Sequence, residues 1–171
     1  MNNIKLFIAA LLLPLTAAAQ TVTSPNGNVS LTFSLTGNGV PTYEMKYKNR
    51  EVVKPSHLGL ELAKDKHASK GLHETSLMDG FTISGTKTST FDETWTPVWG
   101  QYGKIRNNYN ELAVNLTQPS TSRRMTLRFR VYNIGMGLRY EFPQQDSLVY
   151  FVIKDEQIGR ASCRERVSEA V

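Results

Sequence analysis

Apolar and polar residues alternate along most of this chain, and that alternation constrains the fold more than any other feature. Between Val29 and Leu35 an apolar residue occupies every second position. Side chains of a β-strand point alternately to its two faces, whereas a helix repeats after about 3.6 residues. The same spacing returns in the segments 43–47, 58–62, 112–116 and 125–131. The pattern predicts half-buried strands and no convincing helix.

The clearest predicted hairpin covers residues 125–142. Apolar residues alternate on both sides of a turn that we expect at Asn133–Gly137. Pairing Phe129 with Tyr140 keeps the apolar side chains on one face, whereas a slip of one residue would mix the two faces. The stretch Gly135–Gly137 is interpreted as part of this turn, because a phosphate-binding loop needs a third glycine and a following helix.

Two further apolar stretches predict strands. Phe81 and Ile83 indicate a short strand, and Val149–Ile153, which is apolar at every position, indicates a strand covered on both faces. Turn residues separate the predicted strands throughout. Nine or so short strands with frequent turns predict an all-β fold, an antiparallel β-sandwich.

Phe91–Val114, FDETWTPVWGQYGKIRNNYNELAV, is the most distinctive segment and holds both tryptophans of the chain. Three more segments are distinctive: SPNGN at 24–28, PTYEMKYKNREVVKPSHLGLEL at 41–62, and the stretch 137–156, with GLRYEFPQQ and YFVIKDE. Together they resemble the N-terminal β-sandwich region of glycoside hydrolase family 97, the α-glucosidase and α-galactosidase family. The resemblance covers residues 20–157.

The resemblance implies an enlarged, galactose-mutarotase-like sandwich that is incomplete here. It also implies that the catalytic residues lie on a separate (β/α)8 barrel of the same polypeptide, so no residue of this chain inherits a catalytic role. The full-length enzyme would hydrolyse α-linked oligosaccharides, either glucosides or galactosides. Inverting members are expected to hold calcium, with the N-terminal ligand downstream of Gln157. No cofactor is therefore expected in this chain itself.

Two other functions remain open from the sequence. The first is a free-standing carbohydrate-binding β-sandwich, because exposed aromatic rings stack on sugars. The second is an exported structural domain without a sugar ligand. A long open reading frame beyond Gln157 in the gene would favour the enzyme scaffold, and a native stop codon there would favour the binding module.

Both ends of the chain are interpreted as lying outside the domain. Residues 1–19 combine Lys5, an apolar run and small residues up to Ala19, which is the pattern of a secretory signal peptide. The apolar run is too short for a bilayer of ~30 Å, so we expect cleavage after Ala19 and export to the periplasm without a membrane span. Residues 158–171, IGRASCRERVSEAV, resemble a translated sequencing adapter and are predicted to be non-native, including Cys163.

The charge of the chain argues against a nucleic-acid partner. Lys5 and the Arg-rich tail each supply +1 of the formal net charge of +5, which leaves +3 for residues 20–157. A nucleic-acid-binding domain usually shows a basic stripe and a pI above about 9 of its own. Five arginines near Tyr132 are interpreted as a solvated sheet face, or as a surface packed against the barrel. They are Arg123, Arg124, Arg128, Arg130 and Arg139.

Four aromatic residues of the distinctive segment are the candidate site residues. They are Trp95, Trp99, Tyr102 and Tyr109. Such rings either stack on the apolar faces of sugars or anchor a core or domain interface. Packing in the core or against the catalytic barrel is the preferred interpretation, and direct carbohydrate contact is the alternative.

No catalytic or metal site is predicted. Asp92 and Glu93 are adjacent, and adjacent strand residues point to opposite faces, so they cannot flank one glycosidic bond. A structural role is expected for them instead, such as hydrogen bonding in a turn or pairing with Arg106. None of the three histidines has the matching Cys or carboxylate ligands of a zinc site. They are His57, His67 and His73.

Overall fold

The computed structural model describes residues 19–63 and 76–158, and every regular element in these two stretches is a β-strand. The elements are β1 (Gln20–Thr23), β2 (Val29–Thr36), β3 (Val40–Tyr47), β4 (Arg50–Leu62), β5 (Ser76–Leu77), β6 (Thr82–Trp95), β7 (Ile105–Gln118), β8 (Arg123–Tyr132), β9 (Gly135–Glu141) and β10 (Ile153–Ile158). The predicted all-β fold is confirmed. Most of the predicted signal peptide and tail, together with His67 and His73, lie outside the described residues.

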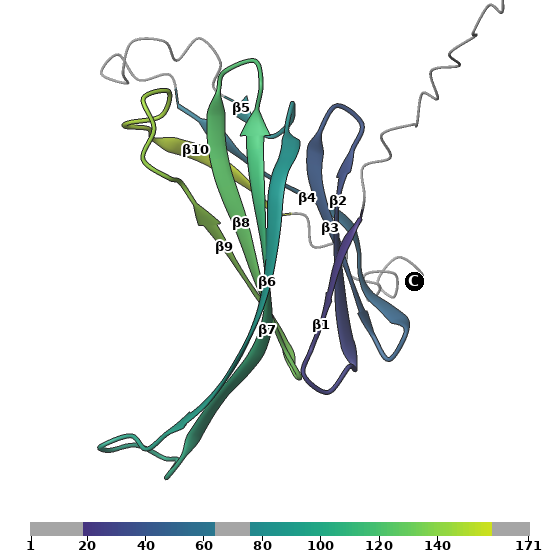
Figure 1. Ribbon diagram of the computed structural model, residues 1–171, viewed down its shortest axis with the longest axis vertical. Coiled ribbons are helices and arrows are strands. Elements are labelled where there is room, and N and C mark those ends of the chain that lie inside the picture. Colours follow the sequence, from purple (N-terminus) through teal and green to yellow (C-terminus); the bar gives the residue numbers. More distant parts are fainter. Residues whose placement is uncertain (1–18, 64–75, 159–171) are drawn as a thin grey trace, which may run out of the picture.

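The strands form two antiparallel sheets that face each other (Figure 1). The first sheet has the order β1-β2-β3-β4-β10, and the short β5 also pairs with β4. The second sheet has the order β6-β7-β8-β9. This arrangement confirms the predicted antiparallel sandwich.

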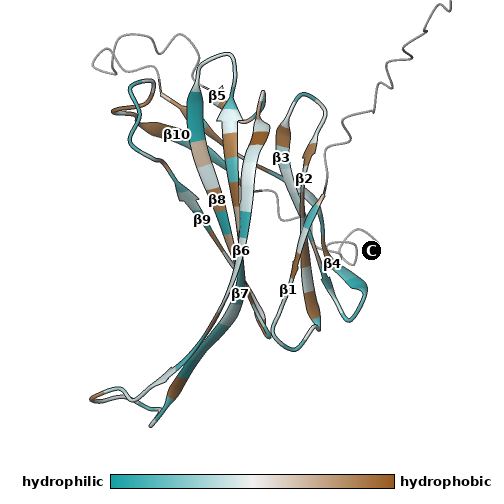
Figure 2. Cartoon of the chain, viewed as in Figure 1, coloured by the Kyte–Doolittle hydropathy of each residue, from teal (hydrophilic) through white to brown (hydrophobic). Residues whose placement is uncertain are grey.

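The inner faces of the two sheets bury the alternating apolar side chains. Every second residue of β8, from Met125 to Val131, is buried. The ring of Phe129 lies 5.9 Å from the ring of Phe33 and 6.3 Å from that of Tyr43, centroid to centroid. Phe129 therefore joins the two sheets. Figure 2 shows the result as brown bands that alternate with paler ones along the strands of the sandwich.

Local chemistry fixes the turn between β3 and β4. Lys48 and Asn49 have φ angles of 49° and 63°. Two successive positive φ angles are typical of the tight type I′ hairpin turn, whose twist matches that of the flanking strands. The Lys48 amide also donates a hydrogen bond of 2.7 Å to the carbonyl of Asn28. The turn predicted near Asn49 is confirmed.

A close backbone contact ties the two sheets together at one end. Gly39 has a φ of +78°, and a Cβ at this position would lie 2.3 Å from the carbonyl oxygen of Phe81. The Phe81 amide donates to the Gly39 carbonyl at 3.1 Å, and the Gly80 amide donates to the Asn38 carbonyl at 2.6 Å. Only glycine fits this position, because both its conformation and its contact exclude a side chain.

The β8–β9 hairpin has the predicted faces but not the predicted register. Phe129 pairs with Leu138, and Tyr140 pairs with Leu127. The turn consists of two residues only, since β9 begins at Gly135, so the predicted turn over Asn133–Gly137 is wrong. A shift of two residues leaves every side chain on its own face. Alternation therefore specifies the faces but cannot distinguish these two registers.

Two strand predictions need correction. Val149–Ile153 is not a covered strand, because only Ile153 belongs to β10 and Val149 is 71% exposed. The chain turns before this stretch and pairs with β4 only from Ile153 onward. The short strand predicted at Phe81 and Ile83 is part of a longer one, because β6 begins at Thr82, directly after Phe81, and is 14 residues long.

Replacement of Phe129 by alanine is expected to lower the free energy of unfolding by about 3–5 kcal/mol, because it leaves a cavity between the sheets. Urea denaturation measures the change. Ile134→Ala is the control, since Ile134 is 99% exposed in the neighbouring turn and should change the stability by less than about 0.5 kcal/mol. Equal effects of the two substitutions would contradict the assignment of Phe129 to the core.

Candidate functional site on the projecting arm

The distal halves of β6 and β7 leave the sandwich and project from it as a two-stranded arm (Figure 1). We define the arm as residues 91–109. Its strands stay paired from Phe91 opposite Tyr109 to Trp95 opposite Ile105. All residues of β6 in the arm are exposed, so this part of the strand packs against no described core. An isolated two-stranded ribbon is only marginally stable in water.

The tip of the arm carries three of the four predicted site residues. Trp95 is 49% exposed, Trp99 is 88% exposed and Tyr102 is 67% exposed. Val98, which the sequence interpretation did not include, is fully exposed beside them. In the sequence, only the position of Val98 between the two tryptophans indicated that it belongs to this exposed tip. Several large apolar side chains gathered at one exposed tip are typical of a contact surface.

Tyr109, the fourth predicted residue, lies at the base of the arm and is buried. Its ring stacks on Phe91 at 5.2 Å and meets the ring of Tyr132 at 5.3 Å, centroid to centroid. The guanidinium carbon of Arg130 lies 4.6 Å from the centre of the same ring. The structure therefore brings Trp95, Trp99 and Tyr102 to one end of the arm and separates Tyr109 from them.

An ion pair joins the two strands of the arm. The Arg106 guanidinium donates two hydrogen bonds to the Asp92 carboxylate, from Nε at 2.8 Å and from Nη2 at 2.6 Å. These hydrogen bonds lower the pKa of Asp92 and raise that of Arg106. Of the structural roles expected for the acidic pair, the structure shows the one with Arg106 as partner, and Asp92 fills it. Asp92 and Glu93 are consecutive residues of β6, so they do not converge on one point.

A second charged cluster covers the outer face of the sheet formed by β7, β8 and β9. Arg128 donates to Glu141 from Nε and Nη2, both at 2.8 Å, and also to Glu111. Arg130 donates to Glu111 at 2.8 Å, and Arg139 donates to Glu141. The arginines near Tyr132 are thus held by carboxylates on the neighbouring strands.

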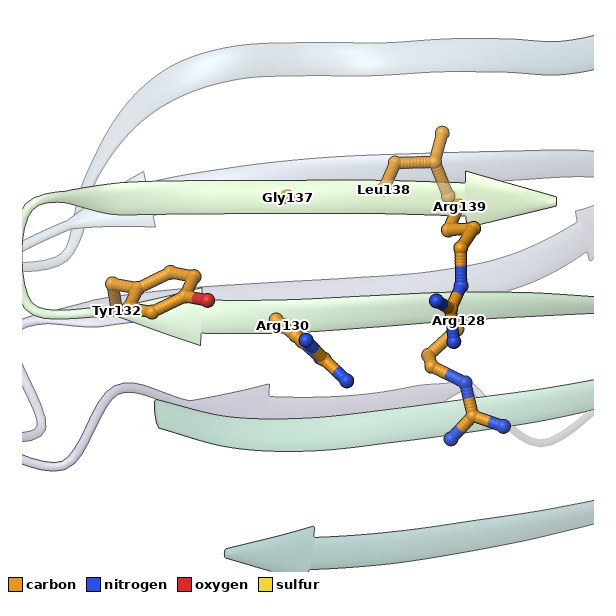
Figure 3. Close-up of a pocket in the computed structure, with 6 residues that line it drawn as sticks. All are labelled: Arg128, Arg130, Tyr132, Gly137, Leu138 and Arg139. Atoms are coloured by element: carbon orange, nitrogen blue, oxygen red, sulfur yellow. The ribbon is translucent and has the colours of Figure 1, made fainter. Parts of the chain in front are cut away.

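Figure 3 shows the shallow hollow beside this cluster, where side chains of β8 lie next to those of β9. Its volume is about 250 Å³. Arg123 does not belong to this face, because it takes an inward position of β8, two residues before the buried Met125, and is only 2% exposed. The predicted row of five arginines on one sheet face is wrong at this position, since odd-numbered residues of β8 point into the sandwich.

The cluster perturbs the acidity of its carboxylates. Hydrogen bonds from Arg128 and then Arg139 lower the pKa of Glu141 to about 2, although partial burial opposes the shift. At Glu111 burial raises the pKa, but the hydrogen bonds from Arg130 and Arg128 outweigh it, and the pKa is lowered. Hydrogen bonding to Glu141 raises the pKa of Arg128. Both carboxylates are therefore ionised at neutral pH.

The described residues contain no group of three or more His, Cys, Asp or Glu side chains that could hold a metal ion. His57 is exposed on β4. In residues 19–63 and 76–158 no helix is long and apolar enough to cross a membrane.

The comparisons with known sequences point to one family. The sequence model described as glycosyl-hydrolase 97 N-terminal matches residues 22–160. A curated relative, a retaining alpha-galactosidase of Bacteroides thetaiotaomicron, is 24% identical over 143 residues. That alignment covers 82% of this chain but only 19% of the relative.

Solved structures agree with this match. A glycoside hydrolase family 97 enzyme from Pseudoalteromonas sp. strain K8, solved in complex with panose, is 27% identical and superposes with a TM-score of 0.74. The match covers 85% of this chain and 20% of that enzyme. A beta-arabinopyranosidase with 18% identity and a TM-score of 0.68 over 81% of this chain shares the fold.

The charged cluster makes stability depend on pH. Because the pKa of Glu141 falls from an ordinary 4.5 to about 2 on folding, its contribution is present above pH 4.5 and is lost as the pH falls toward 2. Glu141→Gln should therefore reduce the difference in unfolding free energy between pH 7 and pH 3, measured with urea. Glu93→Gln, on the exposed arm, is the matched control. An unchanged difference in Glu141→Gln would contradict the prediction.

Proposed function

The chain belongs to glycoside hydrolase family 97 through that family's N-terminal domain, and we propose that it is the non-catalytic N-terminal scaffold of an exported α-glycosidase. One observation carries the proposal: the chain spans about a fifth of the length of the relatives it matches, 19% of one and 20% of another. The rest of such a polypeptide provides the catalytic (β/α)8 barrel. Its substrates are α-linked glucosides or galactosides.

The state of the carboxylates supports a scaffold role. Glycoside hydrolysis needs two carboxyl groups across one sugar, and one of them must donate a proton. Asp92, Glu111 and Glu141 are each bound by at least one arginine, which lowers their pKa. A carboxylate held ionised in this way is a poor proton donor at neutral pH. This supports a scaffold role for the chain, with the catalytic acid of the full-length enzyme on the barrel.

The tip of the arm is the proposed contact with the barrel. Trp95, Trp99 and Tyr102 expose large rings on a ribbon that has no described core of its own. Tryptophan and tyrosine commonly anchor domain and protein interfaces, because they bury a large area with few rotatable bonds. The alternative function, a free-standing carbohydrate-binding module, draws on the same exposed rings, since they also stack on sugars.

Export to the periplasm is part of the proposal. The first strand begins at Gln20, directly after the predicted cleavage site at Ala19, so removal of residues 1–19 leaves every described strand intact. Calcium belongs to the proposed full-length enzyme only. Its ligands are expected outside the described residues, which contain no suitable group of carboxylates.

The reading frame beyond Gln157 tests the proposal. Genomic sequencing should reveal several hundred further codons, and the purified full-length protein should hydrolyse an aryl α-glucoside or an aryl α-galactoside. A protein limited to residues 20–157 should hydrolyse neither. A native stop codon at this point would overturn the proposal and favour the binding module.

Replacement of Trp99 by alanine in the full-length enzyme is expected to lower its unfolding free energy by about 2 kcal/mol or more, as for an interface anchor. Thermal or urea denaturation measures the loss. Lys104→Ala, an exposed residue of the same tip, is the control and should have little effect.

Sugar titration separates the two interpretations of the tip. Tryptophan fluorescence of the soluble protein should not change on addition of a maltooligosaccharide or an α-galactoside if the rings pack against the barrel. A saturable change that Trp99→Ala abolishes would favour direct carbohydrate contact.

A further inference from the structure

The two strands of the arm leave the sandwich beside two turns (Figure 1). One turn joins β1 to β2, and the other joins β8 to β9. The Asn26 amide of the first turn donates a hydrogen bond of 3.0 Å to the side-chain oxygen of Asn133 in the second. The two sheets are therefore tied together at the end where the arm begins.

The arm begins where β7 loses one of its two neighbours. Pairing of β7 with β8 starts at Asn110 opposite Val131, whereas β7 pairs with β6 alone from Tyr109 to Ile105. In the described part of the chain, no other strand pairs with this two-stranded segment. A two-stranded ribbon is only marginally stable alone, so contacts at the junction with the sandwich decide its direction.

Side chains of β8 hold the junction from the outer face of the sheet. The ring of Tyr132 meets the ring of Tyr109 at 5.3 Å, and the guanidinium carbon of Arg130 lies 4.6 Å from the centre of the same ring. Figure 3 shows Arg130 and Tyr132 on β8, with Tyr132 next to the turn that leads to β9. Arg130 Nε also donates to Glu111 at 2.8 Å. Arg130 therefore contacts β7 on both sides of Asn110.

Asn110 holds the junction from the opposite face. Adjacent residues of a strand point to opposite faces, and Asn110 pairs with the buried Val131. Its Nδ2 donates a hydrogen bond of 2.8 Å to the carbonyl of Thr23 in β1. Two consecutive residues, Tyr109 and Asn110, thus fix β7 to β8 on one face and to the other sheet on the other face.

Phe91 passes this restraint to the second strand of the arm. It lies opposite Tyr109, and the two rings stack at 5.2 Å with 20° between their planes. Cross-strand aromatic pairs of this kind stabilise a two-stranded ribbon. Both strands are therefore held at the same level, and the exposed residues of β6 beyond Phe91 follow the direction set there.

The contacts at this junction are directional. Aromatic rings prefer offset or edge-to-face arrangements, and a guanidinium prefers the face of a ring. Glu111 holds the guanidinium of Arg130 in place, and its carboxylate also accepts a hydrogen bond from Arg128. Apolar packing alone is non-directional and would let the ring of Tyr109 tilt. The junction therefore favours one orientation of the arm.

We propose that Arg130, Tyr132 and Asn110 are positioning residues, which clamp the base of the arm and hold its aromatic tip in one direction for contact with the catalytic barrel. The contact itself rests on the proposed function, because the barrel belongs to the longer polypeptide. An arm that swings freely would lose its freedom on docking, and that loss opposes association. A clamped arm presents its tip rings in place before the contact forms.

The distribution of distances between two spin labels measures the motion of the arm. Lys104→Cys labels the tip and Ser120→Cys labels the turn between β7 and β8, since both residues are exposed. Cys163→Ser removes the only other thiol of this chain. Double electron–electron resonance on the chain should give one narrow distribution. Tyr132→Ala or Arg130→Ala should broaden it about twofold or more, because the arm is then free to swing.

Matched variants separate the clamp from general stability. Tyr132→Phe keeps the ring and should leave the width of the distribution unchanged. Asn110→Ala removes one hydrogen bond on the opposite face and should broaden the distribution, so it decides the outcome if an alanine at Arg130 or Tyr132 prevents folding. An unchanged width in the folded alanine variants overturns the proposal, as does a broad distribution in the chain without these substitutions.

The full-length enzyme gives a second readout. If the clamp acts through the tip, Tyr132→Ala should lower the melting temperature less in a Trp99→Ala background than in the unsubstituted enzyme. Independent sites would give additive losses, and additive losses would overturn the positioning role. If the gene encodes no barrel, the proposed function fails, whereas the distance distribution of this chain still decides whether the base clamps the arm.

Discussion

Contact between the two inner sheet faces is the interaction on which the rest of the structure depends. Neither sheet can bury its apolar face alone, so each requires the other. Phe129 meets Phe33 and Tyr43 across the interface, and the tight contact of Gly39 with Phe81 fixes the sheets at one end. Among the described residues, a cleft of about 650 Å³ remains between β9 on one side and β3, β4 and β10 on the other. The same requirement explains both the stable part of the molecule and its open side.

The alternation of apolar and polar residues determined how much of the fold could be predicted from the sequence. It specifies which side chains face inward, so the inward residues of β2 and β8 were predictable from the sequence. It does not encode register, because a shift of two residues preserves every face. The two-residue turn at Asn133–Ile134 decides that register instead. Continuous apolar character at Val149–Ile153 was misleading, since Phe151 packs against the core but Val149 and Tyr150 stay exposed.

The candidate site was predictable in its composition but not in its shape. The two tryptophans and Tyr102 stand out in the sequence, yet Tyr109 from the same segment is buried at the base of the arm. Pairing of β6 with β7 continues beyond the sandwich. The arm part of β6 packs against no described core, so its sequence shows no apolar alternation from which its length could be predicted. The Asp92–Arg106 pair was one of the structural roles that the sequence suggested, and it depends only on neighbouring strands.

The perturbed acidic groups of the described residues suit structural contacts rather than proton donation. A glycosidase needs a carboxyl group whose pKa is raised, usually by an apolar site or a neighbouring negative charge. In the described part of this chain the perturbed carboxyl groups are shifted in the opposite direction, because arginines on adjacent strands bind them. Such pairs hold strands in register and keep the sheet surface hydrated. The same guanidinium contacts that suit Glu111 and Glu141 to a structural role therefore prevent either from acting as a proton donor at neutral pH.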